Sequence, residues 1–183
     1  ILLILYEWSS NSPVEIVASE YDLSQSTLST WYQKLRDITA RCYDLFFNAP
    51  IGGPNIIVQI DESCISKNKY NRGRLLSNQK WLFGGVVLGN HKQCFFEYVE
   101  RRNEETLLEV IQRKIAPGSI IWSDMWGGYQ NLIPRLSHLG YSHERVNHNQ
   151  NFIDPITGAN TQSIKSFSSV MKRNLRKQGT NYG

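Results

Sequence analysis

The spacing of apolar residues predicts helices over the first 46 residues. Within residues 13–21 the apolar side chains recur at helical intervals, and Pro13 suits the first turn of a helix. Over residues 25–46 they recur every three or four positions. The joint Asp22-Leu23-Ser24 has the length of a turn, and Ser24 is a candidate N-cap for the second helix. The pattern is that of two helices joined by a short turn.

After residue 46 the pattern changes to short apolar runs that are typical of strands. A Pro/Gly-rich stretch at 48–55 predicts a linker. Beyond it we predict strands and helices in the order three strands, helix, strand, helix, strand, helix. The strands lie at 56–60, 80–88, 93–99, 119–123 and 141–147, and the helices at 104–115, 129–139 and 162–177.

This order of elements predicts an α/β domain of ribonuclease-H-like fold. The first three strands suit an antiparallel meander, and the helix after them returns the fourth strand parallel to the first. The result is a mixed five-stranded sheet with flanking helices. We predict this domain over residues 56–183, preceded by a helical, helix-turn-helix-like segment over residues 1–50.

Composition excludes several classes of protein. With 40% apolar and 20% charged residues, the chain can bury a core. No run of about 18 apolar residues is present, which excludes a membrane-spanning helix. The three cysteines form no CxxC pair, so we expect neither a disulfide framework nor a cysteine zinc site, and an intracellular, reducing compartment fits best. The chain starts within an apolar run and without Met, which indicates a piece of a longer protein.

Charge is distributed unevenly along the chain. Residues 1–66 carry a net charge of −5 and residues 67–183 a net charge of +9. A basic half suits a polyanion such as nucleic acid, although a solubilising surface would explain it equally well.

If the first two helices are a helix-turn-helix, the residues that open the recognition helix are Gln25, Ser26, Thr27 and Ser29. A purely structural helical bundle is the alternative, and it fits the acidic character of residues 1–55.

Two aspartates follow buried strands that are neighbours in the predicted sheet. Asp61 ends the first strand and Asp124 ends the strand after the crossover, so both carboxylates should meet at one edge. Two close carboxylates repel each other, and a divalent cation relieves the repulsion. The alternative is that both are ordinary acids at strand ends. Glu62 would face away from Asp61, as a surface or supporting acid.

Many short blocks, in one order along the chain, resemble one group of transposases. The first blocks are Asp61-Glu62-Ser63, the basic loop Lys69 to Arg74, Trp81-Leu82-Phe83-Gly84-Gly85, Arg102 with Glu105-Thr106-Leu107, and Ser123-Asp124 with Trp126 and Tyr129. The densest are Val146-Asn147-His148, Asn151-Phe152, Asp154-Pro155, Thr157-Gly158-Ala159, Thr161 and Ile164. Together they resemble the Merlin transposases of eukaryotes and their bacterial ISXO-type relatives over about residues 56–177.

The resemblance implies a DDE-type active site and a DNA substrate. Enzymes of this kind hold two Mg²⁺ or Mn²⁺ ions, cut double-stranded DNA at terminal inverted repeats and join the ends to a target. The resemblance assigns Asp61 and Asp124 as catalytic metal ligands and implies a nuclear location if the host is eukaryotic. A homodimer is left open. His148 lies in the densest block and is either near the site or a hydrogen-bonding residue at a strand end.

The third acid of the family is missing from this chain. In the family it directly follows the isoleucine that corresponds to Ile164, where this chain has Lys165. A protonated lysine cannot ligate a metal ion. We therefore predict a degenerate site that is weak or inactive and binds the Mg²⁺ or Mn²⁺ implied by the resemblance poorly, with Glu144 and Asp154 as the nearest spare acids. The alternatives are a transposon-derived, catalytically dead DNA-binding protein and a protein-interaction module.

Basic residues near the predicted site are candidates for contacts with DNA phosphates. They occupy the loop after the first strand and the last helix, and they are Lys67, Lys69, Arg72, Arg74, Lys172, Arg173, Arg176 and Lys177. A solvated helix face is the alternative for the helical group. We expect Trp81, Trp122 and Trp126 in the core.

Overall fold

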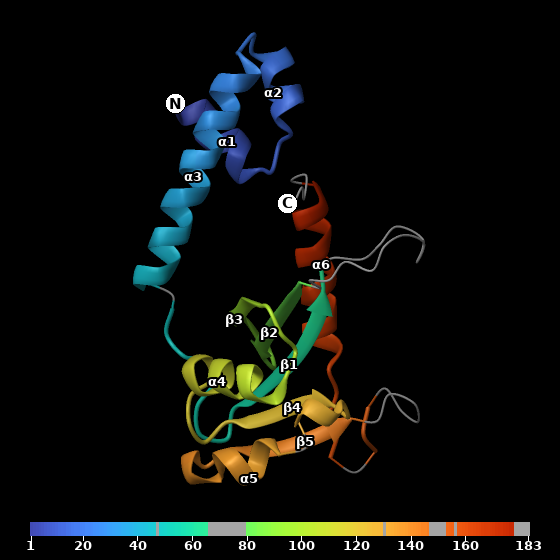
Figure 1. Ribbon diagram of the computed structural model, residues 1–183. Coiled ribbons are helices and arrows are strands. Elements are labelled where there is room, and N and C mark those ends of the chain that lie inside the picture. The colour runs from blue at the N-terminus through green and yellow to red at the C-terminus, as the bar shows by residue number, and fades with distance from the viewer. Residues whose placement is uncertain (47, 66–79, 130, 147–152, 156, 178–183) are drawn as a thin grey trace. The chain divides into compact units, whose positions relative to one another are not determined.

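The computed structural model describes residues 1–46, 48–65, 80–129, 131–146, 153–155 and 157–177. The chain divides into two compact units, Ile1–Ala49 and Pro50–Gly183. Figure 1 shows helices in the first unit and a sheet flanked by helices in the second. Within the described residues, every helix is too short or too polar to span a bilayer.

The first unit contains α1 (Leu2–Ser9), α2 (Val14–Glu20) and α3 (Gln25–Phe46). Its core joins the first half of α3 to the two shorter helices, through Ile4, Val17, Ala18, Leu28, Tyr32 and Leu35. The turn before α3 uses Asp22 at a positive φ of 51°, and the Ser24 carbonyl accepts the Leu28 N–H at 3.0 Å. The predicted helices over 13–21 and 25–46 are confirmed.

The second unit is built on a five-stranded sheet with the order β3-β2-β1-β4-β5. The strands are β1 (Ile57–Cys64), β2 (Trp81–Val87), β3 (Asn90–Val99), β4 (Ile120–Asp124) and β5 (Ser142–Val146). The first three pair antiparallel, whereas β1–β4 and β4–β5 pair parallel. These are the predicted order and directions, so the ribonuclease-H-like fold is confirmed.

Helices cover both faces of this sheet. On one face, α4 (Glu104–Lys114) packs Leu107 and Ile111 into the main core, where they join Ile60 of β1 and Phe83 of β2. On the other face lies α6 (Gln162–Lys177), where Ile164 is fully buried and its N–H bonds the side chain of Gln59. Gln59 and Ile60 are consecutive on β1, so α4 and α6 lie on opposite faces.

The predicted linker is wrong for its second half, which is part of the sheet unit. The Ile51 N–H donates to the Lys114 carbonyl and the Ile51 carbonyl accepts the Ala116 N–H, both at 2.8 Å. The Gly53 N–H donates to Ser119 Oγ at 2.9 Å. Pro and Gly signalled a break in regular structure here, but the backbone groups still find partners.

The predicted helix at 129–139 is also wrong in part. Three short helical segments replace it: η2 (Gly127–Tyr129), α5 (Leu132–Leu136) and η3 (Ser137–Leu139). Pro134 lies in the first turn of α5, where its missing N–H is tolerated, but it prevents one helix from running through from Tyr129. Gly140 then ends η3 at a φ of 72°.

Candidate active site

Two neighbouring parallel strands bring Asp61 and Asp124 to the same face of the sheet. The β1–β4 ladder includes the pair Gln59 and Trp122, and each aspartate lies two residues further along its strand. Because side chains alternate along a strand, each aspartate shares the face of its ladder residue. Gln59 bonds the Ile164 N–H, so this is the face covered by α6.

The strand that carries Asp61 is longer than its apolar pattern predicts. Strand β1 continues to Cys64 because β2 pairs with it as far as the rung of Cys64 and Trp81. Asp61 lies opposite Gly84, where an added Cβ would overlap the Phe96 ring and lie 3.2 Å from Ile164 Cδ1. Gly84 therefore permits the close approach of α6 beside Asp61.

The charges around Asp61 act in opposite directions. Burial is the main cause that raises the pKa of Asp61, to about 6, and the Asp124 carboxylate adds to the rise. Lys165 and Lys172, both on α6, act against it and lower the pKa of Asp61. The structure thus places one other carboxylate, Asp124, and two lysines within electrostatic reach of Asp61.

A buried amide that the sequence reasoning passed over sets the position of Lys165. Gln59 is fully buried, and its Oε1 accepts the Ile164 N–H at 3.1 Å. Its Nε2 donates to Asn160 Oδ1 at 3.0 Å. The amide joins β1 to the start of α6, one residue before Lys165. A polar residue inside an apolar strand run was the available sequence signal.

Neither of the two spare acids completes a metal-binding cluster with the aspartates within the described residues. Glu144 is on β5 and pairs with Trp122 of β4. It lies two residues before Val146, which pairs with Asp124. The Asp154 carboxylate accepts the Thr157 N–H at 2.8 Å and the Thr157 hydroxyl at 3.0 Å, so it shapes its own turn. Across the described ranges, no cluster of three or more His, Cys, Asp or Glu side chains could hold a metal ion.

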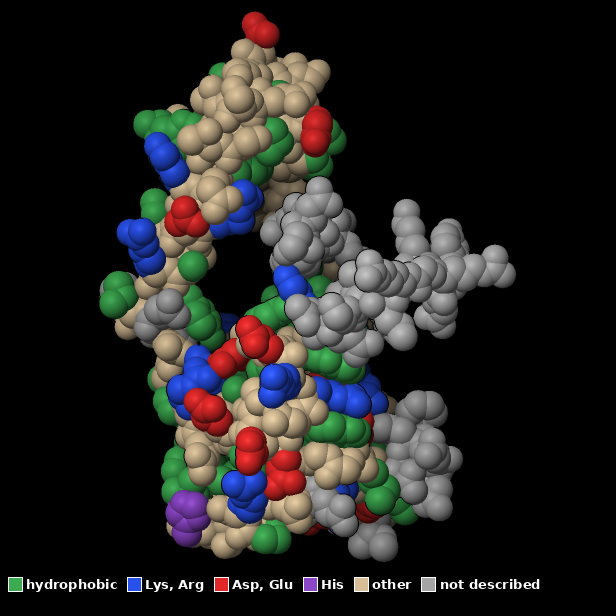
Figure 2. Space-filling view, viewed as in Figure 1, with side chains coloured by type: hydrophobic (Ala, Val, Ile, Leu, Met, Phe, Trp, Pro, Cys, Tyr) green, Lys and Arg blue, Asp and Glu red, His purple; other side chains and the backbone are tan. Residues whose placement is uncertain are grey.

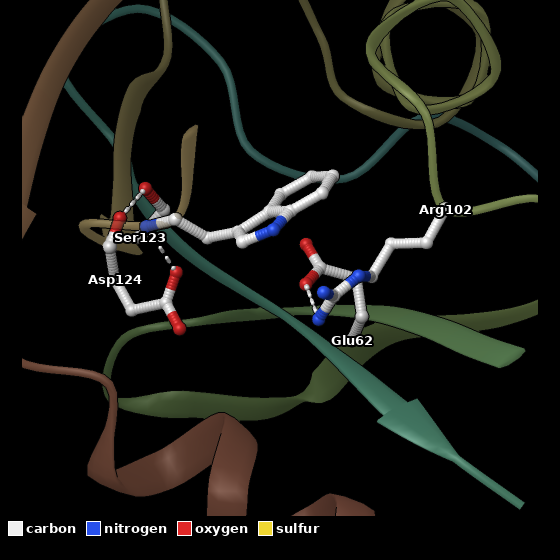
Figure 3. Close-up of polar contacts among 5 residues, drawn as sticks. Glu62, Arg102, Ser123 and Asp124 are labelled. Atoms are coloured by element: carbon white, nitrogen blue, oxygen red, sulfur yellow. Dashed lines mark hydrogen bonds and ion pairs between the residues drawn. The ribbon is translucent and has the colours of Figure 1, made fainter. Parts of the chain in front are cut away.

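Glu62 points to the α4 face and is buried there. Its side chain is 2% exposed, so the expected surface position is wrong, and Oε2 lies 3.9 Å from Arg102 Nη1 (Figure 3). Burial, followed by Asp124 and Asp61, raises the pKa of Glu62 to about 8.

Trp81 and Trp126 are half-buried and lie against the Arg102 guanidinium, whereas Trp122 is buried as predicted.

A buried serine and histidine lie behind Asp124. Ser123 Oγ is 2.8 Å from His143 Nε2 and donates to the Asp124 carbonyl at 2.8 Å. Burial, and then the neighbouring Arg145, lowers the pKa of His143 to about 4. His143 is therefore neutral at physiological pH. The pair joins β4 and β5 directly behind the aspartate.

The DNA-contact candidates fall partly outside the described residues. Those outside are Lys67, Lys69, Arg72 and Arg74, together with the side chains of Arg176 and Lys177. His148, expected near the site or at a strand end, also lies outside the described residues. Of the remainder, Lys172 is half-buried on α6 and Arg173 is exposed there. Figure 2 shows acidic and basic side chains mixed on the face of the sheet unit that it presents. The described side chains on that face therefore do not make a uniformly basic surface.

A family comparison decides what kind of domain this sheet unit is. The model of the ISXO2-like transposase domain matches residues 48–181, which include all five strands, both aspartates and Lys165. The chain belongs to this transposase family. The match confirms the predicted resemblance to the ISXO-type DDE transposases.

Solved structures that resemble this transposase domain include two of retroviral proteins. One is an intasome of simian T-cell lymphotropic virus with the PP2A regulatory subunit B56 gamma, at 13% identity and a TM-score of 0.46, over 74% of this chain and 46% of that chain. This chain thus corresponds to less than half of that protein. The other is the HTLV-2 integrase catalytic core domain with magnesium, in a dimeric form, at 13% identity and a TM-score of 0.45, over 71% of this chain and 78% of that chain. No curated protein matches the transposase domain.

Proposed function

We propose that this transposase domain binds duplex DNA and that its metal-dependent strand transfer is weak or absent. The observation that carries the proposal is the positive charge of Lys165, which lowers the pKa of the Asp61 carboxyl. The transposases that the sequence resembles have a metal ligand at this position, Glu or, in some relatives, Asn. A cation here opposes the binding of divalent metal ions to the two aspartates.

The residues present do not fit a two-metal centre. Asp61 and Asp124 supply the carboxylate oxygens that Mg²⁺ and Mn²⁺ prefer. Holding two such ions about 4 Å apart requires further ligands. Lys165 offers no lone pair while it is protonated, and within the described part of the chain no third potential ligand completes a cluster with the aspartates. The lysine takes the place of a ligand and neutralises part of the charge that would attract the metal.

Charge on α6 supports the DNA-binding half of the proposal. The helix carries basic residues at Lys165, Lys172 and Arg173 and no Asp or Glu along its length. Its apolar side is directed at the sheet, since Ile164 and Ser168 are buried, while Arg173 is exposed. A basic helix beside two aspartates suits a phosphate backbone, whose charge would hold the domain on DNA in a salt-dependent manner.

Metal binding is the direct test of the site. Calorimetric titration with Mg²⁺ and Mn²⁺ should show weak binding to the unmodified chain. Lys165→Met, which only removes the cation, should bind more tightly, and Lys165→Glu, which also adds a carboxylate, more tightly still. Arg173→Glu makes the same charge change at an exposed position of α6 and should match the unmodified chain. Tight binding of two Mg²⁺ ions by the unmodified chain would contradict the proposal.

DNA assays separate the proposal from its alternatives. Salt-sensitive binding of duplex DNA without Mg²⁺-dependent nicking is the expected result. It would also fit a transposon-derived DNA-binding protein that has lost catalysis. Efficient nicking of inverted-repeat DNA would mark an intact transposase. Absence of any DNA affinity at low salt would instead favour a protein-interaction role for the fold.

A further inference from the structure

The Arg102 guanidinium lies between two tryptophans and a buried carboxyl group. Its Cζ atom is 4.4 Å from the ring centroid of Trp81 and 4.4 Å from that of Trp126. Nη1 lies 3.9 Å from Glu62 Oε2. Arg102 belongs to the segment between β3 and α4, and Figure 3 shows its side chain reaching from there to Glu62.

The three contacts of Arg102 reach two strands and the segment that directly follows a third, all near the site. Glu62 directly follows Asp61 on β1, Trp81 opens β2, and Trp126 lies two residues beyond Asp124 at the end of β4. The Trp126 N–H donates to Asp124 Oδ1 at 3.0 Å. Direct contacts therefore run from Arg102 through Trp126 to the Asp124 carboxylate, from the α4 face of the sheet to the α6 face.

Trp126 has little freedom to move within this set of contacts. A Cβ added at Gly128 would overlap its indole ring, so the backbone of Gly128 lies directly against the ring. A Cβ added at the neighbouring Gly127 would meet open space. Tyr129 contacts the indole edge-on, with ring centroids 5.6 Å apart. A shift of the Arg102 guanidinium would thus move the indole and, through it, the backbone N–H that holds Asp124.

The chemistry of the contacts requires arginine at this position. A planar guanidinium can stack on two aromatic rings while its edge reaches a carboxyl group, which the compact ammonium of lysine cannot do. Among the described residues, Glu62 Oε1 has no hydrogen-bond partner, and the Arg102 guanidinium, 3.9 Å from Oε2, forms the ion pair of this buried side chain.

We propose that Arg102 is a positioning residue that sets the orientation of the Asp124 carboxylate through Trp126. The consequence for metal binding rests on the proposed function, because it requires Asp124 to be a metal ligand. The mechanical coupling between Arg102 and Asp124 does not, and it is measurable without metal.

The first test is a double-mutant cycle on unfolding in denaturant, without metal. Arg102→Lys and Asp124→Ala are measured singly and together. The combined change in the unfolding equilibrium constant should be about fivefold smaller than the product of the single changes, as for residues that share a network. The matched control uses Arg101→Lys, at the exposed neighbouring residue, in place of Arg102→Lys. In this control cycle the combined change in the unfolding equilibrium constant should equal the product of the two single changes. If the combined change for Arg102→Lys and Asp124→Ala also equals the product of the single changes, the proposal is overturned.

A second pair of variants keeps the test decisive if Arg102→Lys does not fold. Gly128→Ala displaces the indole without altering a charge, and Gly127→Ala is its control. Coupling to Asp124→Ala is expected for Gly128→Ala alone. Equal behaviour of the two glycine variants would count against a route through Trp126.

Metal affinity then connects the coupling to the site. In the Lys165→Glu background, Arg102→Lys and Gly128→Ala should each weaken Mn²⁺ binding about tenfold, the effect usual for residues that orient a ligand. Arg101→Lys and Gly127→Ala should leave the affinity unchanged. If Lys165→Glu binds no Mn²⁺, the proposed metal site fails, while the metal-free cycle still decides the role of Arg102.

Discussion

Gln59 and Ile164 are joined by a buried hydrogen bond between β1 and the first turn of α6. The Ile164 N–H donates to Gln59 Oε1 at 3.1 Å, and Gln59 Nε2 donates to Asn160 Oδ1 at 3.0 Å. Asp61 lies two residues along β1 from Gln59, and Lys165 follows Ile164 on the helix. One amide side chain thus sets which residue of α6 comes close to Asp61.

Replacing Gln59 should destabilise the sheet unit. Gln59→Leu keeps a similar volume but leaves the Ile164 N–H and the Asn160 side chain without this partner. A buried group left unsatisfied costs about 1–3 kcal/mol, so we expect a loss of about 2 kcal/mol in the free energy of unfolding, measured by urea denaturation. The matched control is Gln112→Leu at an exposed position of α4, which should change stability by less than about 0.5 kcal/mol. Equal stabilities for the two variants would refute the role assigned to this amide.

Replacing Lys165 with an acid should weaken the fold when metal is absent. Asp61 and Asp124 already repel each other, and Lys165 offsets that repulsion. Lys165→Glu removes a cation and adds a third carboxylate, so unfolding in EDTA should become easier by about 1 kcal/mol or more. Added Mg²⁺ should reverse the loss, because a ligand that binds only the folded state stabilises it. A variant as stable as the unmodified chain in EDTA would show that Lys165 is not a counter-ion.

The neutral His143 should make stability depend on pH. Its pKa in the fold is about 4, whereas an unfolded histidine titrates near 6.5. Between these values the unfolded state binds more protons, so this contribution to stability is present above about pH 6.5 and is lost as the pH falls towards 4. It amounts to at most about 3 kcal/mol, since one pKa unit corresponds to about 1.4 kcal/mol.

The measurement compares unfolding free energies at pH 4.5 and 7 for the unmodified chain and for His143→Gln. Asp61 and Glu62 have raised pKa values and give the opposite slope, so the difference between the two proteins isolates the histidine. His138→Gln, at an exposed histidine, is the control and should keep the pH dependence of the unmodified chain. An identical pH dependence in His143→Gln would contradict the assignment.

Local patterns were sufficient to predict the strand order and the two neighbouring strands that carry the aspartates. Apolar runs mark buried strands, and the helical crossover after the antiparallel meander returns β4 parallel to β1. The same reasoning missed the end of β1, because backbone pairing with β2 continues through the polar residues 61–64. An apolar pattern reports burial of side chains and carries no direct information about where a ladder of backbone hydrogen bonds stops.

Contacts that are distant in sequence account for what could not be predicted at the site. Gln59 meets Asn160 and Ile164 about a hundred positions later, and no local spacing relates them. Strand alternation left Glu62 as a surface or a supporting acid, and its burial could not be predicted because the residues that contact it, Arg102 among them, come from separate elements. The family resemblance identified Lys165 as a departure from the family's third metal ligand. Its effect on the pKa of Asp61 depends on where the two residues lie in the fold, which the sequence does not give.

Two basic residues of α6, Lys172 and Arg173, should contribute to DNA binding. Lys172→Gln and Arg173→Gln each remove one positive charge from the helix, and each should weaken binding to a labelled duplex, measured by fluorescence anisotropy at several salt concentrations. Each neutralised phosphate releases about one counterion, so the slope of log affinity against log salt should become shallower by about one unit per lost contact. Lys114→Gln removes the same charge from the end of α4, on the opposite face of the sheet, and should leave the slope unchanged.

Lys172 also lowers the pKa of Asp61, so an effect confined to Lys172→Gln would indicate action through the aspartates. A shallower slope for Arg173→Gln as well requires contact with the phosphate backbone, because Arg173 is exposed and is not among the charges that shift Asp61.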